Sequence, residues 1–467
     1  MVEYDLAIIG AGSGGLTAAG FASKLGARVA LIEKSRIGGD CTWTGCVPSK
    51  ALLKAAKVAH EVRTAALYGI NSSAPVTDMP AVRDYVRKAI ERVYASESPE
   101  QLKKLNIDVF MGAARFLDEK TVAVGSDTVR AKAFLVTTGA RPAAASVDGI
   151  YGLKHFTYEQ IFENDRLPGR MVVIGGGPIG VEIAQAYRRL GSQVTIIATV
   201  LLPREEPEAR STIESVFANE GIQRVRKRAA SARMEGSEIV VGTDDDEVRG
   251  DLLLVATGRK PNVEGLDLEK AGVHYSTKGI PVDDQLRTNV KHIYAAGDVL
   301  GGPQFTHFAG WQAFQASRNA LLPGHSSGFS IVVPWVTFCD PEVAHVGLTE
   351  EQAREEFGDD VRVSRWEMSQ TDRAICENDL GGFVKVVTKR DATLLGATIV
   401  SGRAGEAITE LILAMQHKWK VTDLAGAMHA YPTYSSAVQQ LAAEMAMENL
   451  VSGTSGRLLL GLSKIVR

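Results

Sequence analysis

Residues 4–15 read Tyr-Asp-Leu-Ala-Ile-Ile-Gly-Ala-Gly-Ser-Gly-Gly, an apolar run that leads directly into the glycine spacing of Gly10, Gly12 and Gly15. In a Rossmann-like unit such glycines allow a tight turn, the close approach of the backbone to a pyrophosphate, and the packing of a helix on its strand. The N-terminus of that helix then faces the phosphates. One such fingerprint alone is weak support for a dinucleotide site.

A second copy of the pattern lies at residues 170–180, Arg-Met-Val-Val-Ile-Gly-Gly-Gly-Pro-Ile-Gly, with Gly175, Gly177 and Gly180 in the fingerprint positions. Each copy is followed by another apolar strand, at 27–33 and at 193–198. Two fingerprints with strands and helices in the same order predict two Rossmann-like units that hold two nucleotides.

Two cysteines, Cys41 and Cys46, are separated by four residues shortly after the first fingerprint. A pair this close can close only a small, strained disulfide ring, and strained disulfides are the reducible, catalytic kind. The alternatives are two buried structural cysteines or half of a zinc site, for which His60 is the only nearby imidazole. The spacing favours a redox-active pair, and no resident metal is expected.

Composition excludes several classes of partner. The chain has 467 residues, 45% of them hydrophobic, which is enough for two or three domains. A net charge of -3 leaves no basic surplus for nucleic acid or an anionic membrane. Four cysteines are too few for a secreted disulfide framework, and the sequence has no signal-peptide pattern or membrane-spanning apolar run. We therefore expect a cytoplasmic protein that acts on small molecules.

The remaining pattern divides the chain further. Two buried strands end at Thr-Gly turns, at Gly139 and Gly258, and are interpreted as crossings between the units. Asp298 follows another short strand and could bind a sugar-like hydroxyl chain or be a plain turn residue. Beyond about residue 334 the fingerprints stop, and alternation at 382–387 and 394–400 predicts antiparallel strands followed by amphipathic helices. The expected fold is α/β, with two Rossmann-like dinucleotide-binding domains and a C-terminal α+β domain.

The order of these elements resembles the class I FAD-dependent pyridine nucleotide-disulfide oxidoreductases, the family of glutathione reductase, dihydrolipoamide dehydrogenase and mercuric reductase. The motifs are the first fingerprint, Cys-x4-Cys-x-Pro-Ser-Lys, the two Thr-Gly turns around the second fingerprint, Gly-Asp, and His-Ala-Tyr-Pro-Thr at 429–433. The resemblance implies an FAD-binding domain at 1–148 and 275–333, an NAD(P)H-binding domain at 149–274, and a dimerisation domain at 334–467 through which a homodimer forms.

The same resemblance implies roles for individual residues. Cys46 would lie nearer the flavin and Cys41 would attack the substrate. Lys50, near the flavin, would pair with Glu182 of the second fingerprint helix. The residues expected to contact FAD or the pyridine nucleotide are Gly10, Gly12, Gly15, Glu33, Lys50, Ala113, Gly139, Asp298, Gly175, Gly177, Gly180, Glu182, Thr199 and Gly258. Within this set, Glu33 is assigned to the adenosine ribose, Ala113 to the adenine and Asp298 to the ribityl chain.

The end of the second unit's next strand bears on the choice of nucleotide. An acid there would bond the ribose 2′-hydroxyl of NADH and repel a 2′-phosphate. This chain has Ala198, followed by Thr199, and the first positive charge is Arg204. NADPH is the expected nucleotide, with NADH as the alternative.

The C-terminal motif departs from that of disulfide reductases. There a histidine and a glutamate exchange protons with the thiol leaving group, whereas this chain has Tyr431 and Ser436 at those positions. An unperturbed phenol is a poor base at neutral pH. A tyrosine is similar to mercuric reductase, where it borders the metal-binding pair, so Tyr431 is a candidate catalytic residue. His429 could keep an acid-base role or make a structural hydrogen bond.

Mercuric reductases also carry a vicinal cysteine pair at the extreme C-terminus, and residues 460–467 here contain none. Cys339 and Cys376 are the other cysteines, and lone cysteines are more often small buried hydrophobes. The expected function is a mercuric-reductase-like oxidoreductase that passes electrons from NADPH through FAD and Cys41-Cys46 to a metal ion or small electrophile. The alternatives are a dihydrolipoamide dehydrogenase-like or other low-molecular-weight disulfide reductase, a quinone reductase or diaphorase, and a non-catalytic redox sensor.

Overall fold

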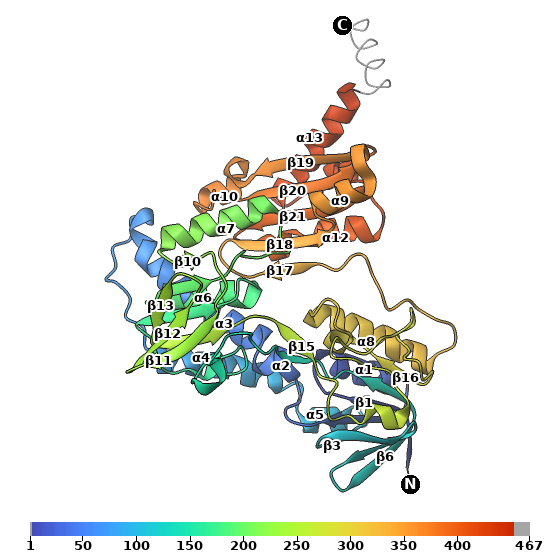
Figure 1. Ribbon diagram of the computed structural model, residues 1–467. Coiled ribbons are helices and arrows are strands. Elements are labelled where there is room, and N and C mark those ends of the chain that lie inside the picture. The colour runs from blue at the N-terminus through green and yellow to red at the C-terminus, as the bar shows by residue number, and fades with distance from the viewer. Residues whose placement is uncertain (1, 453–467) are drawn as a thin grey trace, which may run out of the picture. The chain divides into compact units, whose positions relative to one another are not determined.

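The computed structural model describes residues 2–452, and its elements are labelled in Figure 1. Contacts within the chain divide it into two compact units. Unit 1 contains the residues up to Thr199 and Ile222–Ser330, and unit 2 contains Val200–Gly221 and the residues from Ile331 onward. Within the described residues, no helix is both long enough and apolar enough to cross a lipid bilayer.

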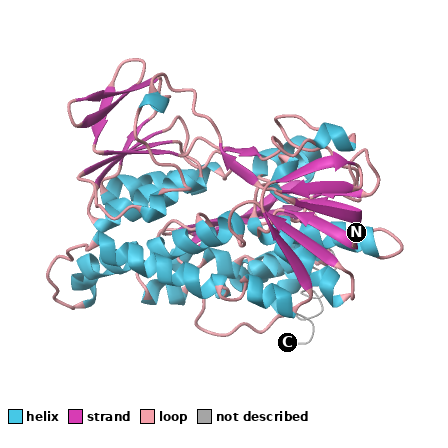
Figure 2. Ribbon diagram, turned by 90° about the horizontal axis from the view of Figure 1, so that it is seen from below, coloured by secondary structure: helices cyan, strands magenta, loops and turns pink. Residues whose placement is uncertain are grey.

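The larger sheet of unit 1 has seven strands in the order β3-β2-β1-β6-β5-β4, with β16 also paired to β6. The parallel members are β1 (Glu3–Ile9), β2 (Val29–Glu33), β3 (Ile107–Met111), β6 (Asp127–Val136) and β16 (Ile293–Ala295). The antiparallel members are β4 (Ala114–Asp118) and β5 (Thr121–Val124). Figure 2 shows these strands fanned by their twist. The near-continuous burial of β1 and β2 is typical of parallel strands with both faces covered.

Helices cover this sheet and extend from it. Small residues let α1 (Ser13–Lys24) pack closely on α8 (Thr306–Leu321), since Gly14 lies against Ala309 and Ala313. Unit 1 also contains α2 (Gly39–Trp43), α3 (Cys46–Thr64), α4 (Met79–Tyr94) and α5 (Pro99–Lys104). Its short 3-10 turns are Ala65–Tyr68, Ile150–Gly152, Ile161–Glu163, Leu268–Ala271 and Gly297–Leu300.

The second fingerprint lies in a separate four-stranded parallel sheet of order β10-β9-β8-β14. Its strands are β8 (Arg170–Ile174), β9 (Gln193–Ile197), β10 (Gln223–Val225) and β14 (Leu252–Val255), and α6 (Pro178–Leu190) follows β8. An antiparallel sheet is formed by β11 (Ser231–Glu235), β12 (Glu238–Gly242) and β13 (Glu247–Gly250). The two Thr-Gly turns are joined, because β7 (Ala140–Pro142) pairs antiparallel with β15 (Arg259–Pro261).

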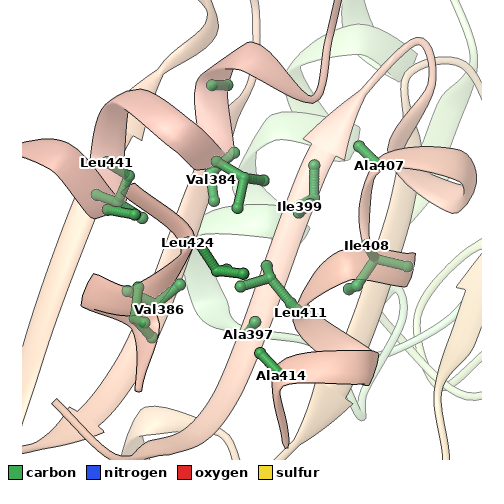
Figure 3. Packing of buried hydrophobic residues seen from close by; sticks show 14 of the residues in the cluster. Val384, Val386, Ala397, Ile399, Ala407, Ile408, Leu411, Ala414, Leu424 and Leu441 are labelled. Carbon is green, nitrogen blue, oxygen red and sulfur yellow. The ribbon is translucent and has the colours of Figure 1, made fainter. Parts of the chain in front are cut away.

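Unit 2 is built on a five-stranded antiparallel sheet of order β17-β18-β21-β20-β19. The strands are β17 (Trp335–Thr337), β18 (Glu342–Gly347), β19 (Val361–Glu367), β20 (Phe383–Lys389) and β21 (Leu394–Ser401). The helices are α7 (Pro207–Glu220), α9 (Glu350–Phe357), α10 (Asp372–Cys376), α11 (Ala404–Ala407), α12 (Thr409–Gln416) and α13 (Ser436–Ser452), with 3-10 turns at Gly358–Asp360, Met368–Gln370 and Val421–Gly426. Figure 3 shows the core between sheet and helices, where Val384 and Ile399 lie near Leu411 and Leu424.

The predicted fold class is confirmed, including the antiparallel strands at 382–387 and 394–400. One segment groups unexpectedly: α7 falls in the predicted NAD(P)H-binding domain but belongs to unit 2 by its contacts. Lys385 of β20 is only 2% exposed and pairs with Glu206, Glu208 and Glu350 at 3.1, 2.8 and 2.8 Å. A buried lysine needs such partners, so these ion pairs fasten α7 to the sheet of unit 2. The boundary between the two nucleotide-binding domains stays a prediction.

Candidate functional site

The first fingerprint has the backbone shape that a pyrophosphate site requires. Gly10 has a φ of 105°, which favours glycine, and a Cβ on Gly15 would overlap the Gly10 carbonyl oxygen. Helix α1 begins after Gly12 without a side-chain cap. The N–H groups of its first turn are therefore available to an anion, so these residues fit the FAD pyrophosphate that the resemblance implies.

Glu33 lies at the end of β2, next to this glycine loop. Its side chain is buried, and its two carboxylate oxygens accept hydrogen bonds from Ala11 N at 2.8 Å and Ser35 N at 2.7 Å. Gly112 N donates to the Glu33 carbonyl oxygen at 2.8 Å, which brings the following Ala113 to the same strand end. Each carboxylate oxygen can accept a further bond, so Glu33 fits an adenosine ribose.

The second fingerprint repeats this geometry. Gly175 has a φ of 117°, and a Cβ on Gly180 would overlap the Gly175 carbonyl oxygen. Helix α6 begins after Gly177, again without a side-chain cap. This backbone geometry fits the second pyrophosphate that the resemblance implies.

The strand end of the second unit carries a cation that the sequence analysis missed. Arg224 of β10 donates from Nε to the Ala198 carbonyl oxygen at 3.2 Å, and from Nη2 to the Thr199 carbonyl oxygen. Its guanidinium thus lies where β9 ends, the position of the nucleotide ribose in this fold. Four of the five residues at 224–228 are basic, which was a usable sequence signal.

Lys50 of α3 and Glu182 of α6 form an ion pair between the two halves of unit 1. Lys50 Nζ lies 2.9 Å from Glu182 Oε2 and 3.2 Å from Oε1. The Glu182 side chain is 7% exposed and that of Lys50 is 37% exposed. The lysine lies four residues after Cys46, near the start of α3.

Cys41 lies on α2, and Cys46 is the first residue of α3; both are reduced thiols in the structure. A hydrogen bond from Cys41 lowers the pKa of Cys46 to about 6, with further support from Thr306 and the charge of Lys50. The same hydrogen bond, together with burial, raises the pKa of Cys41. The pair is therefore asymmetric: the thiolate forms at Cys46, as its place at a helix N-terminus favours, and Cys41 keeps its proton.

Thr306 is a site residue that sequence reasoning missed. It begins α8, and its Oγ1 lies 3.1 Å from Cys46 Sγ. Its hydroxyl can donate to the sulfur and stabilise a thiolate. A threonine that begins a helix gives no local signal linking it to a cysteine 260 residues earlier in the chain.

Asp298 is the predicted ribityl ligand, and one of its carboxylate oxygens accepts a hydrogen bond within the protein. Its Oδ2 accepts from Arg259 Nη1 at 2.7 Å, and Arg259 Nη2 also donates to Asp40 Oδ2 at 2.6 Å. Burial raises the pKa of Asp298, against the opposing effect of the Arg259 charge. Gly258 directly precedes Arg259, and Gly139 and Gly258 close the β7-β15 ribbon, since their carbonyl oxygens accept from Asn262 N and Ala143 N at 2.9 Å each.

In unit 2, Tyr431 and His429 have separate partners. Tyr431 is 75% exposed and donates its hydroxyl to Asp372, and this hydrogen bond raises the pKa of the phenol. His429 Nε2 lies 2.6 Å from Glu410 Oε2, and Nδ1 lies 3.0 Å from the Ala427 carbonyl oxygen. Burial opposes the charge on His429, but the Glu410 hydrogen bond raises its pKa above the usual value. Both ring nitrogens are thus engaged inside the protein.

The other two cysteines differ in their surroundings. Cys339 is 1% exposed, and its Sγ contacts the Pro341 carbonyl oxygen at 3.2 Å, as expected of a small buried residue. Cys376 is exposed at the end of α10, the helix that carries Asp372. The C-terminal position of the vicinal pair of mercuric reductases falls in 453–467, outside the described residues.

Comparison with known proteins agrees with this geometry. Residues 4–313 match the model of the family described as "Pyridine nucleotide-disulphide oxidoreductase", and residues 333–442 match the model of its dimerisation domain. The chain is 35% identical to a mercuric reductase of Lysinibacillus sphaericus over 94% of this chain and 82% of that protein. It is 34% identical to a dihydrolipoyl dehydrogenase of Thermus scotoductus, over 95% and 97% of the two chains.

A solved structure is similar over nearly the whole chain. The Cu(II) complex of the HOCl-induced flavoprotein disulfide reductase RclA from Escherichia coli superimposes with a TM-score of 0.86 at 28% identity. That match covers 95% of this chain and 100% of the other.

Proposed function

The chain belongs to the pyridine nucleotide-disulphide oxidoreductase family, and we propose that it is an NADPH-dependent flavoenzyme that reduces a soft metal ion or small electrophile through Cys41 and Cys46. Membership implies FAD and a pyridine nucleotide as cofactors. The dimerisation domain supports a homodimer. A cytoplasmic location stays a prediction from the sequence.

Bound FAD supplies two-electron transfer between a nicotinamide and the cysteine pair. Three parts of the chain would hold it: the α1 N-terminus the pyrophosphate, Glu33 the ribose and Asp298 the ribityl chain. Lys50, neutralised in part by Glu182, contributes positive charge beside Cys46. That charge favours a thiolate where electrons leave the cofactor site.

The asymmetric thiol pair is the observation that carries the proposal. Soft metal ions prefer thiolate ligands, and a ligating thiol must lose its proton. Cys46, with a pKa of about 6, is already a thiolate near neutral pH. Cys41, whose pKa is raised, would release one proton when the metal binds. A metal held by both sulfurs would be placed to receive the electron pair.

NADPH is proposed over NADH for two reasons. Ala198 removes the carboxylate that would repel a 2′-phosphate, and the Arg224 guanidinium lies at the same strand end. An arginine nearby is the usual means of accommodating that phosphate.

The surroundings of Tyr431 support a metal ion or electrophile over an ordinary disulfide. Disulfide reduction needs a proton donor for the leaving thiol. Tyr431 has a raised pKa, and His429 is held by Glu410 and Ala427 through both nitrogens. The second candidate is a disulfide reductase, favoured by the identity with a dihydrolipoyl dehydrogenase.

The test is NADPH consumption by the purified holoenzyme with Hg(II) in excess thiol. We expect sustained turnover that is lost in Cys46→Ser and kept in Cys376→Ser, the matched control at an exposed cysteine. Absence of mercury-dependent turnover contradicts the proposal. In that case lipoamide, glutathione disulfide and quinones are tested next: turnover with a disulfide identifies a disulfide reductase, quinone turnover that survives Cys46→Ser identifies a diaphorase, and a single stoichiometric reduction identifies a sensor.

A further inference from the structure

Three residues from distant segments of unit 1 form a continuous ion bridge. Arg259, at the start of β15, lies between Asp40 of the cysteine loop and Asp298 of the Gly297–Leu300 turn, with N–O distances of 2.6 and 2.7 Å. The side chains of Arg259 and Asp298 are 18% and 13% exposed. A largely buried guanidinium depends on such partners, since losing one leaves uncompensated charge. The bridge therefore fixes the positions of both carboxylates.

Tyr158 fixes the orientation of the bridge. Arg259 Nε donates to the Tyr158 hydroxyl at 3.3 Å, and that hydroxyl donates to Asp40 Oδ2 at 3.2 Å. The guanidinium carbon lies 5.2 Å from the centre of the tyrosine ring. Asp40 is thus held by two donors, and Arg259 uses all three of its nitrogens within this group.

The segment between the two thiols is anchored at several points. Thr42 Oγ1 donates to Glu97 at 2.9 Å, and Trp43 Nε1 donates to the Ile37 carbonyl oxygen at 2.7 Å. Cys46 is held by α3 itself. Asp40 directly precedes Cys41 and is the anchor that connects this end of the loop to the residue assigned to the FAD ribityl chain.

We propose that Asp40 is a positioning residue for the thiol pair: through Arg259 it holds the Cys41 end of the loop in a fixed relation to Asp298 and Cys46. This inference rests on the proposed function, in which the two sulfurs interconvert between dithiol and disulfide. Closing a disulfide depends on the effective concentration of one thiol at the other, which falls when an anchor is removed. Loss of the Asp40 carboxylate therefore destabilises the disulfide relative to the dithiol.

The test uses the FAD-loaded protein equilibrated in glutathione redox buffers, with the state of Cys41 and Cys46 read by alkylation and mass spectrometry. We expect Asp40→Asn to shift the equilibrium toward the dithiol by roughly 3- to 10-fold. Asp40→Glu, which keeps the charge for Arg259, should recover part of the shift. The matched control is Asp165→Asn, which removes an exposed carboxylate paired with Arg83 at 2.7 Å and should match the wild type.

The experiment needs no electron acceptor, so failure of the positioning role can be distinguished from failure of the proposed redox pair. Equal equilibria for the wild type and Asp40→Asn overturn the positioning role while leaving the redox pair intact. A shift in Asp40→Asn that Asp165→Asn reproduces also overturns it. If the wild-type cysteines form no disulfide in any buffer, the redox pair itself fails, and the positioning role fails with it.

Discussion

The two glycine fingerprints of this chain have the same backbone shape, but the strand ends beside them carry different residues. Gly10 and Gly175 have φ values of 105° and 117°, and Gly15 and Gly180 each pack against the carbonyl oxygen of the first glycine. Glu33 ends the β2 strand of one unit, whereas Ala198 follows β9 in the other. In this fold the glycines let a dinucleotide bind and the strand-end residue selects it, so we expect the two fingerprints to hold different nucleotides.

The largest effect is expected from substitutions that disrupt one glycine fingerprint at a time. Gly15→Val places a branched side chain against the Gly10 carbonyl, which cannot move aside, and should cost about 3 kcal/mol or more of unfolding free energy. We expect this variant to lose FAD. Gly180→Val should keep FAD and lose NADP⁺ binding. FAD content, chemical denaturation and NADP⁺ calorimetry measure the three effects.

Gly20→Ala is the matched control for these variants. It lies on α1 with open space where a Cβ would stand, so it should keep FAD and stabilise the helix by about 0.5–1 kcal/mol. Stoichiometric FAD in Gly15→Val would show that the first fingerprint is not the FAD site.

The next effect concerns the strand end of the first unit. Glu33→Gln replaces one carboxylate oxygen by an amide group that faces an N–H donor, either Ala11 or Ser35. An unsatisfied buried donor costs about 1–3 kcal/mol of unfolding free energy. The amide is also a weaker acceptor for the ribose hydroxyls than the carboxylate, so FAD affinity should fall as well. Fluorescence titration of the apoprotein with FAD measures this change. Unchanged FAD affinity would contradict the assignment of Glu33 to the ribose.

A smaller effect is expected at the strand end of the second unit. Arg224→Gln should weaken 2′-phospho-AMP binding by roughly 10-fold, because the loss of one charged hydrogen bond costs about 1.4 kcal/mol. AMP binding should be unchanged. Ala198→Glu should shift the preference from NADPH toward NADH. Calorimetry with the two ligands measures both, with Arg233→Gln on β11 as the control. Equal weakening for AMP and 2′-phospho-AMP would mean that Arg224 only supports the strand.

The sequence predicted the parts of the site that depend on local pattern. The fingerprints, the cysteine spacing and the Thr-Gly turns are contiguous motifs, and each appears in the structure as a strand, turn or helix start. Thr306 and Arg259 were missed because their contacts are with residues far away in the chain, whereas Arg224 lies in a basic run that could have indicated it. The position of α7 was missed for the same reason: its ion pairs with Lys385 leave no trace in hydrophobic periodicity.

The Lys50–Glu182 ion pair joins the two halves of unit 1 and lies near Cys46. Because the pKa of Cys46 is lowered to about 6, its alkylation rate in the holoenzyme should rise with pH around a midpoint near that value. The Lys50 charge lowers this pKa and the Glu182 charge raises it. Lys50→Met should therefore move the midpoint up, and Glu182→Gln should move it down. Site-resolved mass spectrometry separates Cys46 from exposed Cys376. Midpoints that move in the same direction in both variants would mean that the pair acts on Cys46 through folding, and that charge does not link the second fingerprint helix to the thiol.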